Sequence, residues 1–222
     1  MTWIKSKNLN ITINFKLIII NKMETERPYA KVLKILLKDI AIKPTITSIA
    51  KEMDMSRVGL WKVLKAMQSK KLIALSPVGT GKTSAYIMTL NWNNPLIEKM
   101  LSLALTEEAM KNQRWLSSFS ELENQVDFLL LYGSILHSPK EANDIDVLGI
   151  VSDKRHFKKI GEIIAKIQKT QIKKVHAINF TAAEFRQELE KPNKAFIDAV
   201  KQGIVLFGQE NFIKFIIAIS KK

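Results

Sequence analysis

The chain has 222 residues, no cysteine and a formal net charge of +14, which excludes disulfides and cysteine-based zinc sites. Its share of apolar residues, 46%, and of charged residues, 25%, is typical of a soluble globular protein with one large or two smaller domains. Apolar runs such as Leu17–Ile20 and Phe215–Ile219 are far shorter than the roughly 18 residues of a membrane helix. Because no signal-peptide pattern opens the chain, we expect a cytoplasmic protein with no membrane partner.

The positive charge is concentrated toward the start of the chain. Residues 1–23 carry four Lys and no acid, residues 24–92 carry 12 Lys or Arg against 5 acids, and residues 93–222 carry 19 against 16. Such an excess favours binding to a polyanion, since bound cations release the counterions of the polyanion. The alternative is a lysine-rich composition whose basic faces are simply solvated.

Residues 1–23 form an extension with its own pattern. Apolar and mostly polar residues alternate from Leu9 to Ile19, which is typical of a strand. One interpretation is an extra strand that pairs with the body of the protein or with a second subunit in a homodimer. The other is an upstream extension, with Met23 as the natural start of the protein.

Residues 24–92 predict three helices and a hairpin. The first helix runs from Pro28 until Pro44 breaks it, and Thr45 or Thr47 caps a short second helix that ends at Met53. A third helix starts at a cap, Ser56, and runs to about residue 70, with Leu60, Leu64 and Met67 on one apolar stripe. Residues 72–75 and 85–88 are short strand-like runs around a glycine-containing turn at 76–82.

One segment imitates a phosphate-binding loop. Ser76–Thr83 reads S-P-V-G-T-G-K-T, close to G-x-x-x-x-G-K-[ST]. Such a loop must open a helix, whose N-terminal amides bind the phosphate. A strand-like run follows here, so we interpret Gly79 and Gly81 as parts of the hairpin turn.

Three helices followed by a hairpin are the plan of a winged helix, whose third helix enters the major groove of double-stranded DNA. The stretch MSRVGLWKVLKAMQSKKLIAL resembles the helix and following strand of bacterial and archaeal winged-helix regulators. The resemblance implies a set of DNA-facing residues on the third helix and at the wing tip: Ser56, Arg57, Trp61, Lys62, Lys65 and Lys82. The alternative is a protein-interaction module.

The second half predicts a helical linker over 93–125 and a small mixed-sheet domain with flanking helices over 126–222. Helices are expected over Leu96–Ala104, about Glu107–Leu122, Lys154–Gln171, Glu184–Leu189 and Ala195–Lys201, with a last helix at the C-terminus. Strands are expected over Val126–Tyr132, Ile145–Val151, Val175–Phe180 and Ile204–Phe207. The whole chain is therefore expected to be an α+β protein.

The segment FLLLYGSILHSPKEANDIDVLGIV carries the clearest chemistry. One buried strand ends at Gly133 and Ser134, and another opens with Asp144 and Asp146. Carboxylates two residues apart on a strand point to the same face, and two carboxylates with substrate phosphates are a set that Mg²⁺ prefers. The alternative is a strand-loop-strand unit with a solvated turn.

This motif resembles the Gly-Ser and Asp-x-Asp signature of polymerase-beta-type nucleotidyltransferases. The resemblance implies that Gly133 and Ser134 hold a nucleoside triphosphate and that Asp144 and Asp146 are catalytic ligands of Mg²⁺. Active members carry a third carboxylate on the next core strand, but Val175–Phe180 contains no acid. His176 of that strand is interpreted as a pocket or surface residue rather than a base.

Together the two resemblances imply a DNA-binding transcriptional regulator with a nucleotidyltransferase-fold domain that binds Mg-nucleotide and has weak or no activity. The tail from Ile178 on, INFTAAEFRQEL…AFIDAVKQGIVLFGQENF, resembles a subgroup of winged-helix proteins with such an appended domain, many of which lack the third acid. The alternative is an active enzyme that transfers a nucleotidyl group to a protein, a nucleic acid or a small molecule. A third interpretation is an interaction module of a toxin–antitoxin-like pair.

Overall fold

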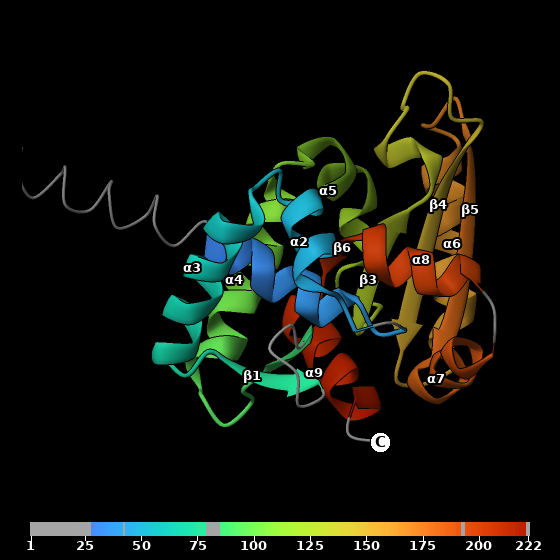
Figure 1. Ribbon diagram of the computed structural model, residues 1–222. Helices are drawn as coiled ribbons and strands as arrows, with labels where there is room; N and C mark the ends of the chain where they lie inside the picture. The colour runs from blue at the N-terminus through green and yellow to red at the C-terminus, as the bar shows by residue number, and fades with distance from the viewer. Residues whose placement is uncertain (1–27, 42, 79–84, 192–193, 221–222) are drawn as a thin grey trace, which may run out of the picture.

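The computed structural model describes residues 28–41, 43–78, 85–191 and 194–220, and gives no side-chain placement for residue 85. The predicted strand in the N-terminal extension, Met23 and the wing-tip Lys82 lie outside these ranges. The pairing of that strand, with this chain or with a second subunit, therefore stays a prediction. Figure 1 shows the described elements as two side-by-side parts, with α3 at the left and β4 and β5 at the right.

The first part begins with the three predicted helices. Residues 28–38 form a helix, followed by α2 (Ile46–Glu52) and α3 (Arg57–Ser69). Thr45 caps α2 through a reciprocal capping box with Ser48, and Ser56 caps α3 by accepting a hydrogen bond from the Gly59 amide. The predicted stripe of α3, Leu60, Leu64 and Met67, is fully buried. This confirms the helical pattern inferred from the spacing of the apolar residues.

An antiparallel hairpin follows these helices. β1 (Ile73–Val78) pairs with β2 (Ala85–Leu90), and Leu75 is opposite Met88. The residues that follow the imitation phosphate loop thus form a strand, not the helix that phosphate binding at such a loop requires. The arrangement of three helices and a hairpin is that of a winged helix.

The connection to the second part differs from the prediction. α4 (Leu96–Met110) continues past the expected break near residue 105 and ends at Lys111, before α5 (Gln113–Phe119) and a 3₁₀ turn, η1 (Ser120–Leu122). Ile97, Leu101 and Leu105 keep one buried stripe along the whole of α4. Since burial of that stripe continues without interruption, the helix has no reason to end at the weakly helical residues in its middle.

The second part is built on a four-stranded mixed sheet in the order β5-β4-β3-β6. Its strands are β3 (Phe128–Tyr132), β4 (Asp144–Val151), β5 (Lys174–Thr181) and β6 (Ile204–Phe207). β3 is antiparallel to both β4 and β6, whereas β4 and β5 are parallel and are joined through α6 (His156–Gln168). A parallel pair needs such a crossover helix.

The two faces of the sheet are covered by different helices. On one face, Leu131 and Val147 pack in a cluster with Trp115 of α5 and Ile160 of α6. On the other face lie α7 (Ala182–Glu190), α8 (Lys194–Gln202) and α9 (Gln209–Ser220). In Figure 1, α8 crosses in front of the sheet below the loop that joins β3 to β4. The start of β4 is therefore left uncovered by α8.

One hydrophobic core joins the two parts of the molecule. Leu33 and Leu60 of the first part belong to the same buried cluster as Phe128 and Phe212 of the second. A polar network lies beside this core: Lys38 donates to Glu108 Oε2 of α4 over 2.9 Å and to the Gly203 carbonyl over 2.7 Å. The winged-helix unit and the sheet are thus held together by both apolar and ionic contacts.

Among the described residues, none of the helices has the length and apolar character that crossing a membrane requires.

Candidate functional site

The exposed face of α3 carries the basic residues expected at a DNA surface. Arg57 and Lys62 are exposed, and α3 lies at the edge of the molecule remote from the sheet (Figure 1). The hydroxyl of Ser56 accepts a hydrogen bond from the Gly59 amide over 3.0 Å, so it holds the start of the helix. The contact of these three residues with DNA stays a prediction.

Trp61 and Lys65 join α3 to the hairpin. The Trp61 ring is half-buried and lies 5.0 Å from the Tyr86 ring of β2, and the Lys65 ammonium lies 4.9 Å from the centre of the Trp61 ring. Lys65 also donates to Gln68 Oε1 over 3.1 Å. Trp61 therefore has a structural role that its predicted place among the DNA-facing residues did not include.

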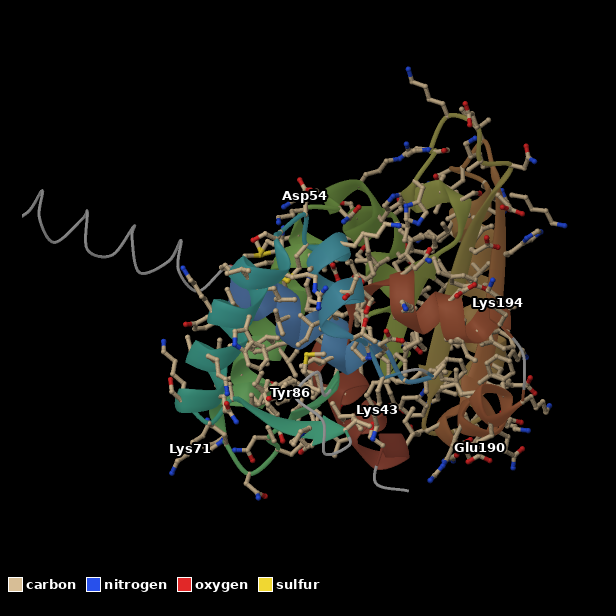
Figure 2. The ribbon with its side chains drawn as sticks, in the orientation of Figure 1. Lys43, Asp54, Lys71, Tyr86, Glu190 and Lys194 are labelled. Carbon is tan, nitrogen blue, oxygen red and sulfur yellow. The ribbon has the colours of Figure 1, made fainter. Side chains whose placement is uncertain are left out.

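Figure 2 shows the boundaries of this unit: Asp54 lies in the turn before α3, Lys71 in the turn after it, and Tyr86 on the hairpin. Asp54 and Lys71 have left-handed backbone, with φ of 53° and 56°. A left-handed residue directly after a helix ends it sharply. α3 is thus separated from α2 and from β1 by tight turns.

A second group of predicted residues comes together at the start of β4. Asp144 and Asp146 are on the same face of the strand, and Asp146 is paired in register with Tyr132 of β3. Gly133 follows Tyr132 with a φ of +83°, and a Cβ there would collide with the Asp146 carboxylate. The positive φ therefore favours glycine here, and any larger residue would also displace the end of the Asp146 side chain. Ser134, exposed, follows at the start of a 3₁₀ turn, η2 (Ser134–Leu136).

His176 completes this group, which the sequence pattern alone did not reveal. In the parallel pairing of β4 and β5, His176 stands opposite Asp146. Its Nδ1 lies 3.2 Å from Asp144 Oδ2 and 3.6 Å from Asp146 Oδ1. The strand register is the missing signal: without it, the histidine cannot be assigned to either carboxylate.

The carboxylates determine the electrostatics of this face. Burial and the nearby charge of Asp144 raise the pKa of Asp146, and His176 partly offsets the increase. Burial and the charges of Asp146 and Asp144 raise the pKa of the Tyr132 hydroxyl to about 12. Tyr132 therefore stays neutral at ordinary pH, and the two carboxylates beside it offer ligands that suit a cation.

The nucleotidyltransferase resemblance implies a magnesium ion at this site. The three side chains present fit that ion only in part. The two carboxylates supply the oxygen ligands that Mg²⁺ prefers. The third position, however, is an imidazole nitrogen, which this hard ion avoids. The three side chains are between 24% and 42% exposed, so a ligand has access to them.

No protein-family model matches this chain, and no curated protein matches it. Similar solved structures include the heme sensor protein PefR from Streptococcus agalactiae in complex with heme, at 14% identity and a TM-score of 0.33, covering 77% of this chain and 94% of that one. Heme-free PefR is 13% identical with a TM-score of 0.33, covering 76% and 99%. An apo mutant of Lactococcus lactis ZitR is 18% identical with a TM-score of 0.28, covering 73% and 96%. TM-scores this low do not establish a shared fold, and no family follows from them.

Proposed function

We propose that this protein is a DNA-binding transcriptional regulator whose sheet domain binds a nucleoside triphosphate through a divalent cation and transfers nucleotidyl groups weakly or not at all. The observation that carries the DNA-binding half is the exposed basic face of α3. The observation that carries the nucleotide half is the close approach of Gly133 to Asp146.

Three features of the first part support binding to double-stranded DNA. Arg57 and Lys62 are exposed on α3, where cations can reach phosphates and base edges. The Trp61–Tyr86 contact fixes the hairpin relative to α3, so a groove and the neighbouring backbone can be contacted at the same time. The excess of seven positive charges over residues 24–92 favours a polyanion.

The nucleotide half is supported by the arrangement around β4. Asp144 and Asp146 offer oxygen ligands to a cation that in turn binds phosphate oxygens. Gly133 lets the backbone pass close to the Asp146 carboxylate, so that the adjacent Ser134 can offer a hydroxyl and an amide as donors to a phosphate near the bound cation.

The residue beside the two carboxylates, His176, supports weak or absent nucleotidyl transfer. Two-metal phosphoryl transfer needs enough negative charge to hold both ions. Asp144 and Asp146 supply two carboxylates, and β5 places a histidine where a third would be expected. One cation can still anchor a triphosphate without the second that would stabilise the leaving group.

We expect the triple substitution Arg57→Ala, Lys62→Ala and Lys65→Ala to weaken binding to a mixed-sequence DNA duplex on the order of a hundredfold at physiological salt. The slope of affinity against salt on logarithmic axes should fall by about 0.9 for each phosphate contact removed. A mobility-shift or fluorescence-anisotropy titration at several salt concentrations measures both quantities.

The matched control is Lys158→Ala, Lys159→Ala and Lys166→Ala on α6, which removes the same three charges from exposed positions in the second part. This variant should keep nearly all the affinity of the wild type. Equal losses in the two variants, or no loss in either, would refute the assignment of α3 as the DNA surface.

Asp146→Ala is expected to abolish nucleoside triphosphate binding while leaving DNA binding by the first part unchanged. The substitution removes one of two carboxylates that would hold the cation, and α3 lies on the opposite side of the molecule (Figure 1). Filter binding with labelled triphosphates and a divalent cation measures the first effect. Unchanged nucleotide affinity in the variant would contradict the proposal.

An active nucleotidyltransferase is the second candidate, because Asp144, Asp146 and His176 still lie close enough together to hold a cation, even without a third carboxylate. Incubation with radiolabelled triphosphates and divalent cations, with and without DNA, separates the two candidates. Little or no labelled product supports the regulator. Robust cation-dependent transfer that disappears in Asp144→Ala would establish the enzyme instead.

A further inference from the structure

We infer that Asp144, Asp146 and His176 form a binding site for a divalent transition-metal ion, such as Mn²⁺, Co²⁺ or Zn²⁺, in preference to Mg²⁺. The inference rests on the carboxylate pair used in the proposed function, but it requires neither nucleotide nor DNA.

The distances between the three side chains suit one shared ion. One ligand atom from each lies within 4.8 Å of the others. His176 Nδ1 lies 3.2 Å from Asp144 Oδ2 and 3.6 Å from Asp146 Oδ1. An ion about 2.1 Å from each of two ligands separates them by roughly 3.0–3.4 Å. The side chains therefore already stand near the spacing that coordination imposes.

The strand register explains why these residues meet. Asp146 and His176 are partners in the parallel pairing of β4 and β5, so their side chains rise from the same face of the sheet. Asp144 is two residues earlier on β4 and shares that face. All three ligands come from strands rather than loops, so their backbone positions are the same with and without a bound ion.

The chemistry of the donors decides the class of ion. Two carboxylate oxygens alone would suit Mg²⁺, but an imidazole at the third corner favours Mn²⁺, Co²⁺ and Zn²⁺. Within the part of the chain that the structure describes, no other group of His, Asp and Glu is arranged to hold an ion. Among the described residues, this group therefore contains no third carboxylate that could take the place of the His176 nitrogen as a ligand.

The site also keeps positions open for a second ligand. The side chains of Asp144 and His176 are 32% and 42% exposed. Metal sites with three protein ligands and solvent access keep a coordination position for water or for a substrate group. A phosphate entering beside Gly133 would reach that position, which links this ion to the proposed nucleotide.

The test uses the full chain, freed of metal with a chelator and without nucleotide. Titration with Co²⁺ is expected to give a visible absorption band, and calorimetry should show Mn²⁺, Co²⁺ and Zn²⁺ binding at least about tenfold more tightly than Mg²⁺. His176→Ala should weaken Co²⁺ and Zn²⁺ binding by about a hundredfold or more and change Mg²⁺ binding little, while His176→Asp should shift preference toward Mg²⁺.

His137→Ala and His156→Ala are the matched controls, since both residues are exposed histidines outside the site, and they should leave the cobalt band unchanged. Magnesium binding as tight as that of the transition metals, or a cobalt band that survives His176→Ala, would overturn the inference. A band that depends on His176 without triphosphate binding would sustain this inference and refute the nucleotide half of the proposed function. Triphosphate binding that occurs with Mg²⁺ but not with Mn²⁺, Co²⁺ or Zn²⁺ would refute this inference and support the nucleotide half of the proposed function.

Discussion

Replacing Glu108 by glutamine is expected to lower the free energy of unfolding by about 3 kcal/mol. The Glu108 carboxylate accepts hydrogen bonds from Lys34 over 2.6 Å and from Lys38 over 2.9 Å, and the Lys38 side chain is only 8% exposed. A glutamine would offer one oxygen acceptor, and its NH₂ group would face the other lysine. Lys38 would then be a buried cation that has lost its carboxylate partner and still donates to the Gly203 carbonyl. Chemical denaturation followed by circular dichroism measures the loss.

The control for this change is Glu210→Gln, which breaks the ion pair between Lys99 and Glu210 at side chains 78% and 61% exposed. Exposed pairs contribute about 0–1 kcal/mol, so the control should lose no more than that. Comparable losses in the two variants would contradict the special role of the buried network.

The contribution of the Glu108 carboxylate to the free energy of unfolding should depend on pH. Burial alone would raise the pKa of Glu108, but attraction by Lys38 and hydrogen bonds from both lysines hold it below its usual value of 4.5. Because its pKa is lower in the folded state, Glu108 stabilises the protein above pH 4.5, and this stabilisation is lost as the pH falls through the folded-state pKa. The stability difference between wild type and Glu108→Gln should therefore shrink in acid.

Phe185→Ala is expected to cost about 4 kcal/mol of unfolding free energy, because it leaves a cavity in a cluster of four aromatic rings. The Phe185 ring is fully buried, and its centre lies 5.4 Å from that of Phe215, 5.9 Å from Phe180 and 6.1 Å from Phe196. These rings come from α7, α9, β5 and α8. Their loss of contact should loosen the helices that cover the sheet, which faster amide exchange in α7 and α8 would report.

Phe157→Ala provides the comparison, since this half-buried ring of α6 packs against the other face of the sheet. It should cost at most about 2 kcal/mol, as a partly exposed ring loses less burial. An equal or larger loss at Phe157 would mean that the aromatic cluster around Phe185 does not dominate the packing.

Local patterns in the sequence determined the elements and several of their ends. The caps Thr45 and Ser56 act within three residues of the chain, so their effect on α2 and α3 could be inferred without the fold. The apolar stripe of α3 and the buried runs of β3 and β4 follow periodicities of the same short range. The spacing of Asp144 and Asp146 likewise placed both carboxylates on one face.

Only the tertiary structure decided which distant residues meet. Nothing in the local sequence shows that His176 pairs in register with Asp146, because a shift of one residue in a strand would turn the side chain to the opposite face. Nor does it show that Lys38 finds Glu108, 70 residues away, or that α4 continues past residue 105. Partners of this kind are selected by the burial of the whole core, and that free energy depends on all the packed elements at once.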